Sequence, residues 1–324
     1  MRRPLPDGER LPVLIAEVEI MSVLPAAEPQ GEPAPAAALE MAIEPRTRDL
    51  GGGFQVRRVL PFAKRRALGP FVFFDHMGPT AFPAGAGLDV RPHPHIGLAT
   101  VTYLFEGEIT HRDSIGSVQV IRAGAINWMT AGRGIVHSER TPPELRPAGS
   151  RLHGVQLWVG LPLGQEEAPP DFTHYPAASL PAIEGEGRRI RVMIGALYGV
   201  RSPVKTLSEL FYADVDLAAG ARLEIPAEHA DRGIYIVSGA LALDSKSFAE
   251  HQLLVLRQGA VTTVTAEQPT RLLLLGGAKL EGERHIWWNL VSSAQARIDQ
   301  AKADWKAGRF PPIPGETEFI PLPE

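Results

Sequence analysis

Glycine and proline interrupt this chain so often that it has little room for long helices. The 324 residues include 32 glycines and 30 prolines, two residue types that end helices and favour turns. Between them lie short runs rich in apolar residues, such as LATVTYLFEG and GIYIVSGALALD. Short runs of this kind, separated by turns, are typical of antiparallel sheets. The sequence therefore predicts an all-β fold.

Two β-domains are expected, because one hydrophobic core rarely serves a chain of this length. The β-rich stretch at 189–279 repeats the rhythm of strand and glycine turn seen at 54–162. The expected boundaries divide the chain into four parts: 1–45, a disordered extension rich in proline, alanine and glutamate; 46–165, the first β-domain; 166–284, the second β-domain; and 285–324, a C-terminal helix and tail.

One helix is expected near the C-terminus. Ser292 followed by Gln295 is a capping-box pattern, and Gly308 supplies a stop signal. Apolar residues between them recur on one helix face. We expect Trp305, on that face, to dock the helix on a β-domain.

The charge balance argues against a nucleic-acid partner. The chain carries 33 basic and 37 acidic residues, a formal net charge of −4, and so offers no overall basic field. The densest basic stretch is a solvated hairpin face or a contact for an acidic partner; it contains Arg57, Arg58, Lys64, Arg65 and Arg66. No direct binding of nucleic acid is expected.

No segment has the pattern of a membrane span or a signal peptide. The most apolar N-terminal stretch, 11–27, is interrupted by Glu17 and Glu19 and lacks a cleavage-site pattern. We therefore expect a cytoplasmic protein that makes no contact with a membrane.

The residues suited to chemistry lie in two short motifs, His93-Pro94-His95 and His137-Ser138-Glu139. On a strand, residues two apart point to the same face. If the two strands are neighbours, three imidazoles and one carboxylate converge as ligands for a divalent metal. Without cysteine in the chain, a metal must be held by nitrogen and oxygen. The alternative is that these histidines only form hydrogen bonds in a polar crevice.

Other histidines and acids have simpler interpretations. In the second domain, His229 is followed by Asp231 instead of a second histidine, and His251 has no partner, so that domain is expected to be metal-free. Asp75 and His76 either line the mouth of the metal cavity or, as we prefer, satisfy backbone groups in a turn.

Several further polar residues are expected to pair at the surface. This set comprises His111, Arg112, Asp113, His153, His174 and His285. Trp128, in INWM, forms either an apolar wall of the cavity or ordinary core.

Long stretches around the two motifs resemble the pirin family of the cupin superfamily. The similarity lies in RPHPHIGLATVTYLFEGEITHRDS, INWMTAGRGIVHSE and VQLWVGLP, and the C-terminal HIWWNLVSS with its following residues resembles bacterial members. The resemblance covers about 50–324. It implies two cupin-type β-barrels with one metal ion in the first, held by His93, His95, His137 and Glu139.

The resemblance also implies two kinds of function. One is a quercetin 2,3-dioxygenase-like enzyme that opens a flavonol or related enolic substrate with O2, using Fe(II) and Glu139 as general base. The other is a metal-containing regulator that binds a transcription factor or a metabolic enzyme. The motifs leave the metal open, because imidazole and carboxylate accept Fe, Mn, Co, Ni, Cu and Zn alike. Ala99 stands where other pirins have an acidic residue, so Glu139 is the one carboxylate expected at the site.

Overall fold

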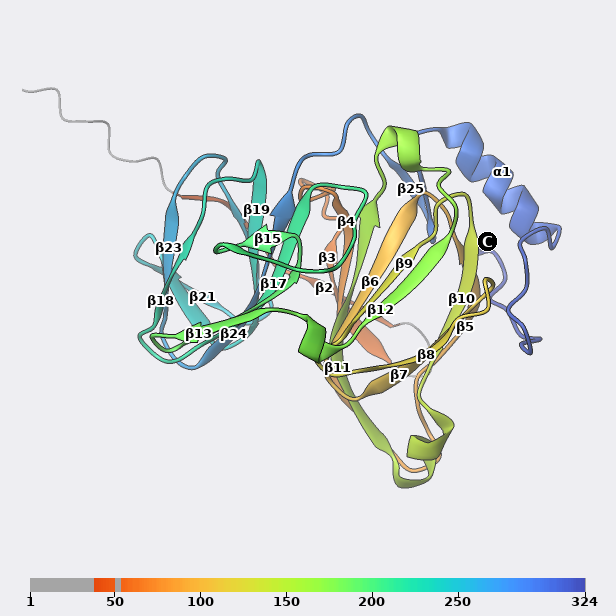
Figure 1. Cartoon of the computed structure of the whole chain (residues 1–324), viewed down its shortest axis with the longest axis horizontal. Helices are drawn as coiled ribbons and strands as arrows, with labels where there is room; N and C mark the ends of the chain where they lie inside the picture. The colour runs from red at the N-terminus through yellow and green to blue at the C-terminus, as the bar shows by residue number, and fades with distance from the viewer. Residues whose placement is uncertain (1–37, 50–53, 324) are drawn as a thin grey trace, which may run out of the picture. The chain divides into compact units, whose positions relative to one another are not determined.

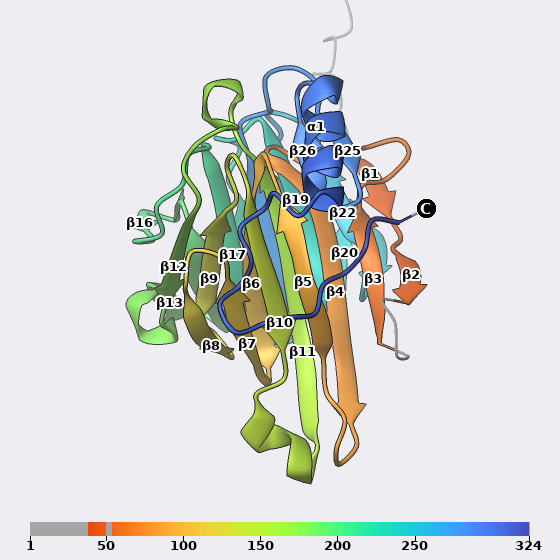
Figure 2. The ribbon, with the colours of Figure 1, turned by 90° about the vertical axis from the view of Figure 1, so that its right-hand side faces the viewer.

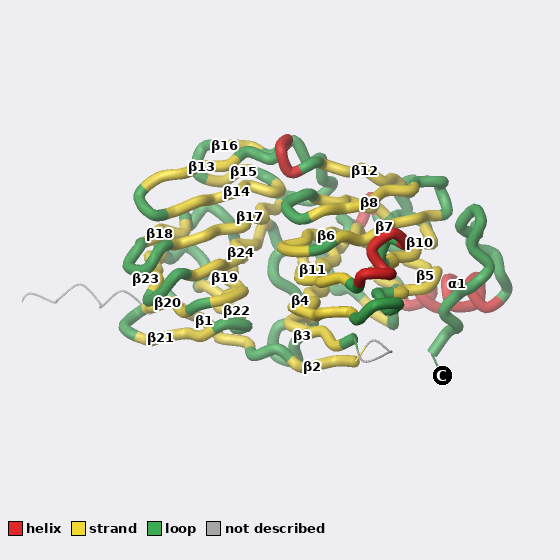
Figure 3. The backbone as a smooth tube through the Cα atoms, turned by 90° about the horizontal axis from the view of Figure 1, so that it is seen from below, coloured by secondary structure: helices red, strands yellow, loops and turns green. Residues whose placement is uncertain are grey.

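The computed structural model describes residues 38–49 and 54–323, so residues 1–37 of the expected extension lie outside the described residues. In these described ranges strands dominate the backbone, and the helical segments are α1 and three short 3-10 turns (Figure 3). Figure 1 shows two sets of sheets that follow one another along the chain. The all-β, two-barrel prediction is confirmed. Among the residues that the structure describes, no helix is long and apolar enough to cross a membrane.

The first barrel combines a seven-stranded sheet, in the order β12-β9-β6-β11-β4-β3-β2, with a four-stranded sheet, β5-β10-β7-β8. The strands are β2 (Arg46–Asp49), β3 (Gln55–Leu60), β4 (Phe71–Phe82), β5 (Asp89–His95), β6 (Leu98–Glu106), β7 (Glu108–Asp113), β8 (Val118–Arg122), β9 (Ile126–Thr130), β10 (Ile135–Arg140), β11 (Ser150–Gly160) and β12 (Asp171–Tyr175). Three 3-10 turns follow strands of this barrel: η1 (Pro143–Ala148), η2 (Leu163–Gln165) and η3 (Ala177–Ser179).

The second barrel repeats the design, with sheets β1-β22-β19-β24-β17-β14-β13 and β18-β23-β20-β21. Its strands are β1 (Leu39–Ile43), β13 (Ala182–Gly185), β14 (Arg188–Ile194), β17 (Leu210–Leu217), β18 (Arg222–Ile225), β19 (Asp231–Ser238), β20 (Ala240–Leu243), β21 (Lys246–Ala249), β22 (Leu253–Leu256), β23 (Thr262–Ala266) and β24 (Thr270–Gly277). Two small hairpins complete the set: β15 (Ala196–Leu197) with β16 (Val200–Arg201), and β25 (His285–Trp287) with β26 (Leu290–Ser292).

Local sequence explains how each strand is buried. In β18, Leu223 and Ile225 are buried while Arg222 and Glu224 are exposed, as the two-residue period of a strand requires. The apolar run 272–275 of β24 is buried on both faces. Leu273 and Leu275 belong to the cluster that also contains residues of the first barrel, whereas Leu272 and Leu274 belong to a cluster within the second barrel. A continuous apolar run therefore marks a strand whose two faces are both covered, and alternation marks a strand with one solvated face.

The large sheets of the two barrels share one hydrophobic core. Phe74 from β4 and Tyr103 from β6 belong to the same buried cluster as Tyr212 and Tyr235 of the second barrel. The rings of Phe74 and Tyr235 lie 4.6 Å apart. Burying one such large side chain contributes about 1.5–3 kcal/mol. The shared core thus stabilises both barrels together.

Two edge strands differ from the expected organisation. Residues 39–43, expected within the disordered extension, form β1, which pairs with β22 of the second barrel. Residues 171–175, expected in the second domain, form β12, which pairs with β9 of the first barrel. Local sequence indicates that a segment is extended, but tertiary structure decides which sheet takes it.

The predicted C-terminal helix is present as α1 (Gln295–Lys306), but its expected capping box is wrong. Ala294 is the N-cap residue and makes no side-chain cap, while Ser292 donates its hydroxyl to the buried carboxylate of Glu166 instead. Ile298 and Ala301, which are fully buried, dock the helix on the first barrel.

Trp305 does not dock the helix as expected. Its ring packs near Phe310 and Phe319, and its indole N–H donates to the carbonyl oxygen of Ile320 at 3.0 Å. Trp305 therefore holds the C-terminal tail, which Figure 2 shows crossing the molecule below α1.

Candidate metal centre

The two histidine motifs lie on neighbouring strands of the four-stranded sheet. In the antiparallel pair β5–β10, His137 is the direct partner of His93, and Ile135 is the partner of His95. Residues two apart on a strand face the same side, so the three imidazoles project together. One nitrogen from each of His93, His95 and His137 lies within 4.8 Å of the others. The structure thus brings these three predicted residues into one group.

The three imidazoles are buried, with exposed fractions of 6% for His93, 1% for His95 and 1% for His137. Burial lowers the pKa of His95 and His137 well below the ordinary value, and it lowers the pKa of His93 as well. The rings are therefore neutral at neutral pH. A neutral imidazole offers a lone pair, which is the form that binds metals.

Hydrogen bonds decide which nitrogen of each ring offers that lone pair. Nδ1 of His93 lies 2.8 Å from the carbonyl oxygen of Arg91, and Nδ1 of His95 lies 2.9 Å from that of Asn289. A carbonyl only accepts, so each Nδ1 carries the hydrogen and each Nε2 is bare. Nε2 of His95 faces Nε2 of His137 at 3.0 Å. When the hydrogen of His137 is on its Nδ1, both of these Nε2 atoms are bare and repel each other unless a cation lies between them, and the donor set then suits a divalent metal ion.

His111 and Asp113 lie behind this group, and the prediction that they pair at the surface is wrong. They are 3% and 0% exposed, because β7 runs beside β10 in the sheet. Nδ1 of His111 lies 3.4 Å from Nδ1 of His137, and Nε2 of His111 lies 3.0 Å from Oδ2 of Asp113. The two-residue spacing of His111 and Asp113 was the signal that could have placed both on one buried face.

Asp113 is held as a carboxylate. Burial raises its pKa, but the hydrogen bonds from His111 and from the backbone N–H of Ser117 outweigh that effect, and the pKa lies below the ordinary value.

Glu139 lies beside the imidazole group without joining it. The strand register shifts between His137 and Glu139, so Glu139 pairs with Val90. Its carboxylate accepts a hydrogen bond from the hydroxyl of Thr102 at 3.2 Å and another from the amide of Gln156 at 2.7 Å. Thr102 and Gln156 are partners across β6 and β11. Neither was singled out from the sequence, since only the sheet register brings them to Glu139.

A cavity of about 500 Å³ opens beside these residues. Its wall includes His93, Glu139 and Gln156 together with the aromatic rings of Phe73 and Trp158, which stack at 3.9 Å. The cavity is thus apolar on one side and carries hydrogen-bonding groups beside the histidines, as small-molecule sites commonly do.

Asp75 and His76 are not in a turn, so the preferred interpretation is wrong. Both lie in the long strand β4. Asp75 lines the cavity and accepts two hydrogen bonds of 2.8 Å from Arg58. His76 faces the second barrel, where it contacts the hydroxyl of Tyr235 at 2.7 Å and Nε2 of His153 at 2.8 Å.

Two apolar residues that the sequence analysis considered for the metal cavity belong to the core between the barrels. Trp128 and Ala99 are both in that buried cluster, and the indole N–H of Trp128 donates to Thr130 at 3.0 Å. The core interpretation of Trp128 is therefore the correct one.

Known proteins match this architecture along most of the chain. Residues 53–159 match the family described as Pirin, and residues 212–311 match the Pirin C-terminal cupin domain. A pirin-like protein of Caulobacter vibrioides is 49% identical over 290 residues, which cover 88% of this chain and 100% of that protein. The chain belongs to the pirin family.

Two solved structures are similar to this pirin-family chain, and both are described as quercetin 2,3-dioxygenase from Acinetobacter baumannii. The first is 33% identical with a TM-score of 0.82, covering 88% of this chain and 95% of that one. The second is 29% identical with a TM-score of 0.79, covering 85% of this chain and 98% of that one. The resemblance stated from the sequence is confirmed, as is the bicupin fold.

The second cupin barrel places its histidines apart. The ring of His229 stacks on Phe211 at 4.5 Å, and His251 lies beside His76 with ring centres 5.2 Å apart. Asp231 instead pairs with Arg65 at 2.8 Å and accepts the backbone N–H of Gly69. His251 and Asp231 therefore contact residues of the first barrel, whereas His229 packs within the second barrel.

The basic stretch of this pirin-family chain is also used internally. Arg58 pairs with Asp75, Arg65 with Asp231, and Arg57 donates to the carbonyl oxygen of Gly78. The interpretation of this stretch as a purely solvated hairpin face is therefore wrong for Arg57, Arg58 and Arg65.

The remaining histidines expected at the surface differ in exposure. His285 is exposed, as expected. His153 and His174 are half-buried, and His174 contacts the side chain of Asn127 at 2.7 Å.

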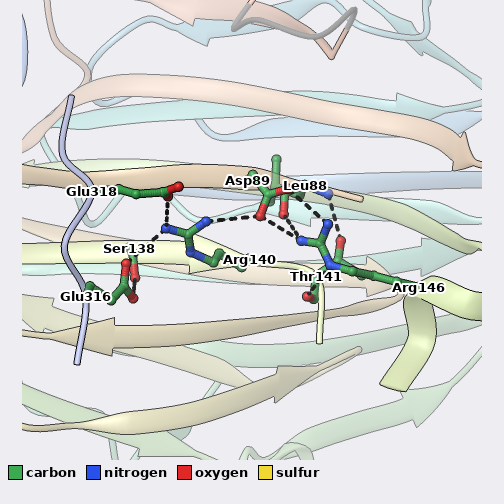
Figure 4. Close-up of polar contacts among 8 residues, drawn as sticks. All are labelled: Leu88, Asp89, Ser138, Arg140, Thr141, Arg146, Glu316 and Glu318. Carbon is green, nitrogen blue, oxygen red and sulfur yellow. Dashed lines mark hydrogen bonds and ion pairs between the residues drawn. The ribbon is translucent and has the colours of Figure 1, made fainter. Parts of the chain in front are cut away.

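The C-terminal tail is fastened behind the metal-centre strands (Figure 4). Glu316 accepts hydrogen bonds from Ser138 at 2.5 Å and from Arg140 at 3.0 Å, on either side of Glu139. Glu318 accepts a second bond from Arg140 at 2.9 Å. The backbone N–H of Ile320 donates to Pro92 at 2.8 Å, and Ile320 lines the cavity. The tail thus connects both ligand-bearing strands, a role that its sequence did not indicate.

Proposed function

We propose that this chain is a metal-dependent dioxygenase of the quercetin 2,3-dioxygenase type, which opens a flavonol or related enolic compound with O2. The observation that carries the proposal is the group of three buried, neutral imidazoles beside a cavity of about 500 Å³ that also contains Glu139. The two Acinetobacter baumannii structures described as quercetin 2,3-dioxygenases support the same assignment.

In this proposal His93, His95 and His137 would hold one divalent metal ion, with Glu139, which lines the adjoining cavity, as the fourth ligand. We propose Fe(II) as that ion. When bound, it would supply Lewis-acid stabilisation of an enolate oxygen and a common position for both reactants, which removes entropic cost from their encounter.

Glu139 would also take the proton of the enol hydroxyl as general base. Its carboxylate is kept in place by Thr102 and Gln156, so it faces the substrate cavity in one orientation. A base that is held in position loses less entropy when it accepts the proton.

The cavity wall favours a flat, aromatic substrate. Phe73 and Trp158 present stacked rings on one side, and such rings contribute both apolar area and favourable aromatic contacts. The ion pair of Arg58 and Asp75 supplies polar groups for substrate hydroxyls.

The test combines metal analysis with oxygen uptake on purified full-length protein. Wild type is expected to hold about one equivalent of metal and to consume O2 when quercetin is added, and His93→Ala is expected to lose both. His285→Ala is the matched control, because His285 is exposed. Metal-free wild type would contradict the metal centre. Bound metal without oxygen uptake would contradict the enzyme on quercetin and favour the regulator that binds a protein partner.

A further inference from the structure

We propose that His111 and Asp113 are a positioning pair that fixes which nitrogen of His137 carries its hydrogen, and thereby sets how tightly the centre binds a divalent ion. The inference rests on the proposed function in one respect, namely that His137 is a metal ligand. It adds two residues that the ligand set does not contain. Neither has a bond to the proposed ion.

Asp113 is the fixed end of the chain of hydrogen bonds that leads to His137. Its Oδ1 accepts the backbone N–H groups of Ile115 at 3.1 Å and Ser117 at 2.9 Å. Its Oδ2 faces Nε2 of His111 at 3.0 Å. A carboxylate only accepts hydrogen bonds, so Nε2 of His111 carries the hydrogen and Nδ1 of His111 is bare.

The ring of His111 cannot easily turn to reverse this order. It is 3% exposed and stacks on Phe172 of β12 with ring centres 4.3 Å apart and an angle of 14° between the planes. Asp113 lies on the same strand and fixes the ring edge. The bare Nδ1 of His111 therefore points constantly at His137.

The bare Nδ1 of His111 influences which ring nitrogen of His137 carries the hydrogen. Nδ1 of His137 faces the bare Nδ1 of His111 at 3.4 Å, so the hydrogen between them belongs to His137. With the hydrogen there, Nε2 of His137 is bare where it faces His95. The other tautomer of His137 would donate from Nε2 to the bare Nε2 of His95 at 3.0 Å, and the acceptor atom on His111 opposes that tautomer. Backbone carbonyl groups fix the other two rings in the same tautomer. His137 has no such carbonyl, and His111 with Asp113 takes its place.

The distance of 3.4 Å between Nδ1 of His111 and Nδ1 of His137 indicates how strong their hydrogen bond is. It exceeds the usual N–H···acceptor length of about 2.9–3.0 Å, so this is a weaker bond than those made by the carbonyl groups. Losing an outer partner of a metal-binding histidine typically costs about 10–100-fold in metal affinity. We expect a loss in that range when the pair is disrupted.

The experiment measures Zn²⁺ affinity of the full-length protein by competition with a chelator, a readout that needs no turnover. His111→Phe keeps the flat ring but removes the acceptor, and it is expected to lower the affinity about 10–100-fold. Asp113→Asn is expected to act in the same direction, because its amide can donate to His111. His111→Asn keeps an acceptor atom in the place of Nδ1 and is expected to stay close to wild type.

A second readout follows the tautomer itself. Nitrogen NMR of histidine-labelled, metal-free protein should show a larger share of His137 with hydrogen on Nδ1 in wild type and in His111→Asn than in His111→Phe, because without the His111 acceptor the hydrogen moves to Nε2, which faces His95 at 3.0 Å. Arg112→Gln is the control within the same strand, since Arg112 is neither one of the proposed ligands nor one of the pair. Circular dichroism identifies any variant that fails to fold.

The outcomes separate the two proposals. Wild-type protein that binds no Zn²⁺ would overturn the proposed metal centre. Wild-type binding with unchanged affinity and tautomer in folded His111→Phe and Asp113→Asn would overturn the positioning role and leave the centre intact. Equal losses in His111→Phe and His111→Asn would also overturn it, because packing and not the acceptor atom would then be responsible.

Discussion

Replacing Asp214 tests how the second barrel supports β6, the strand whose Thr102 contacts Glu139. Asp214 is 3% exposed, and both of its oxygens accept hydrogen bonds from Arg271, at 2.9 and 2.5 Å. It also accepts the hydroxyl of Tyr103 at 2.6 Å. Tyr103 is the neighbour of Thr102, which contacts Glu139 from the other face of β6. The buried carboxylate therefore anchors the strand that holds the proposed base.

These contacts determine how much Asp214→Asn lowers the free energy of unfolding. Asp214→Asn removes the charge and turns one acceptor into a donor that faces Arg271. A hydrogen bond to a charged group contributes about 1.5–3 kcal/mol. The side chain of Arg271 is 27% exposed, so water compensates part of the loss. We expect the free energy of unfolding to fall by about 2–3 kcal/mol.

Urea unfolding measures this loss, and Asp216→Asn is the matched control. Asp216 lies 3.8 Å from the same Arg271, but its side chain is 48% exposed, so a change within about 0.5 kcal/mol is expected. Tyr103→Phe should cost about 1.5–3 kcal/mol in wild type and less in Asp214→Asn, because the hydroxyl has then lost its charged acceptor. Equal destabilisation by Asp214→Asn and Asp216→Asn would refute the reasoning.

Three further predictions concern the proposed base Glu139, His76 between the two barrels, and Glu316 in the C-terminal tail. Glu139→Gln should retain part of the metal but lower the turnover of quercetin about 100-fold or more in an oxygen electrode, as expected for a general base; unchanged turnover would exclude that role. Burial, with the nearby His153, lowers the pKa of His76 from 6.5 to about 2. Below pH 6.5, His76 is therefore protonated in the unfolded chain but stays neutral in the folded one. As the pH falls below 6.5, His76 should lower the free energy of unfolding by up to about 1.4 kcal/mol per pH unit. Urea unfolding at pH 7.5 and 5.5 should therefore show a smaller loss of stability in His76→Gln than in wild type. An equal loss in both proteins would argue against this role of His76. Glu316→Gln should speed hydrogen exchange in residues 135–140 more than Glu318→Gln does, because the carboxylate of Glu316 is 8% exposed and that of Glu318 is 58% exposed; equal rates would contradict the fastening role of the tail.

The sequence by itself determined the features that depend on neighbours along the chain. Its glycines and prolines divide it into short runs, and this requires a fold of strands and turns. The spacing of His93 and His95 places both rings on one face, whatever lies around them. The C-terminal helix was likewise predictable, since an apolar face and a glycine stop are local signals.

Tertiary structure decided which distant residues complete the site. The sequence HRDS predicts surface positions for His111 and Asp113, because nothing in it indicates that β7 runs beside β10. Asp75 and His76 were assigned to a turn, although adjacent positions of one long strand point to opposite sides, one to the cavity and one to the second barrel.

The physical reason is that hydrogen bonds across a sheet depend on strand order and register. Gln156 reaches Glu139 because β11 pairs with β6 so that Gln156 lies opposite Thr102. Glu316 reaches Ser138 across 178 positions of the chain. A shift of one residue in the pairing of β11 with β6 would turn Gln156 to the opposite face. The local pattern thus specifies which residues can bind a metal, and the register specifies which residues hold them in position.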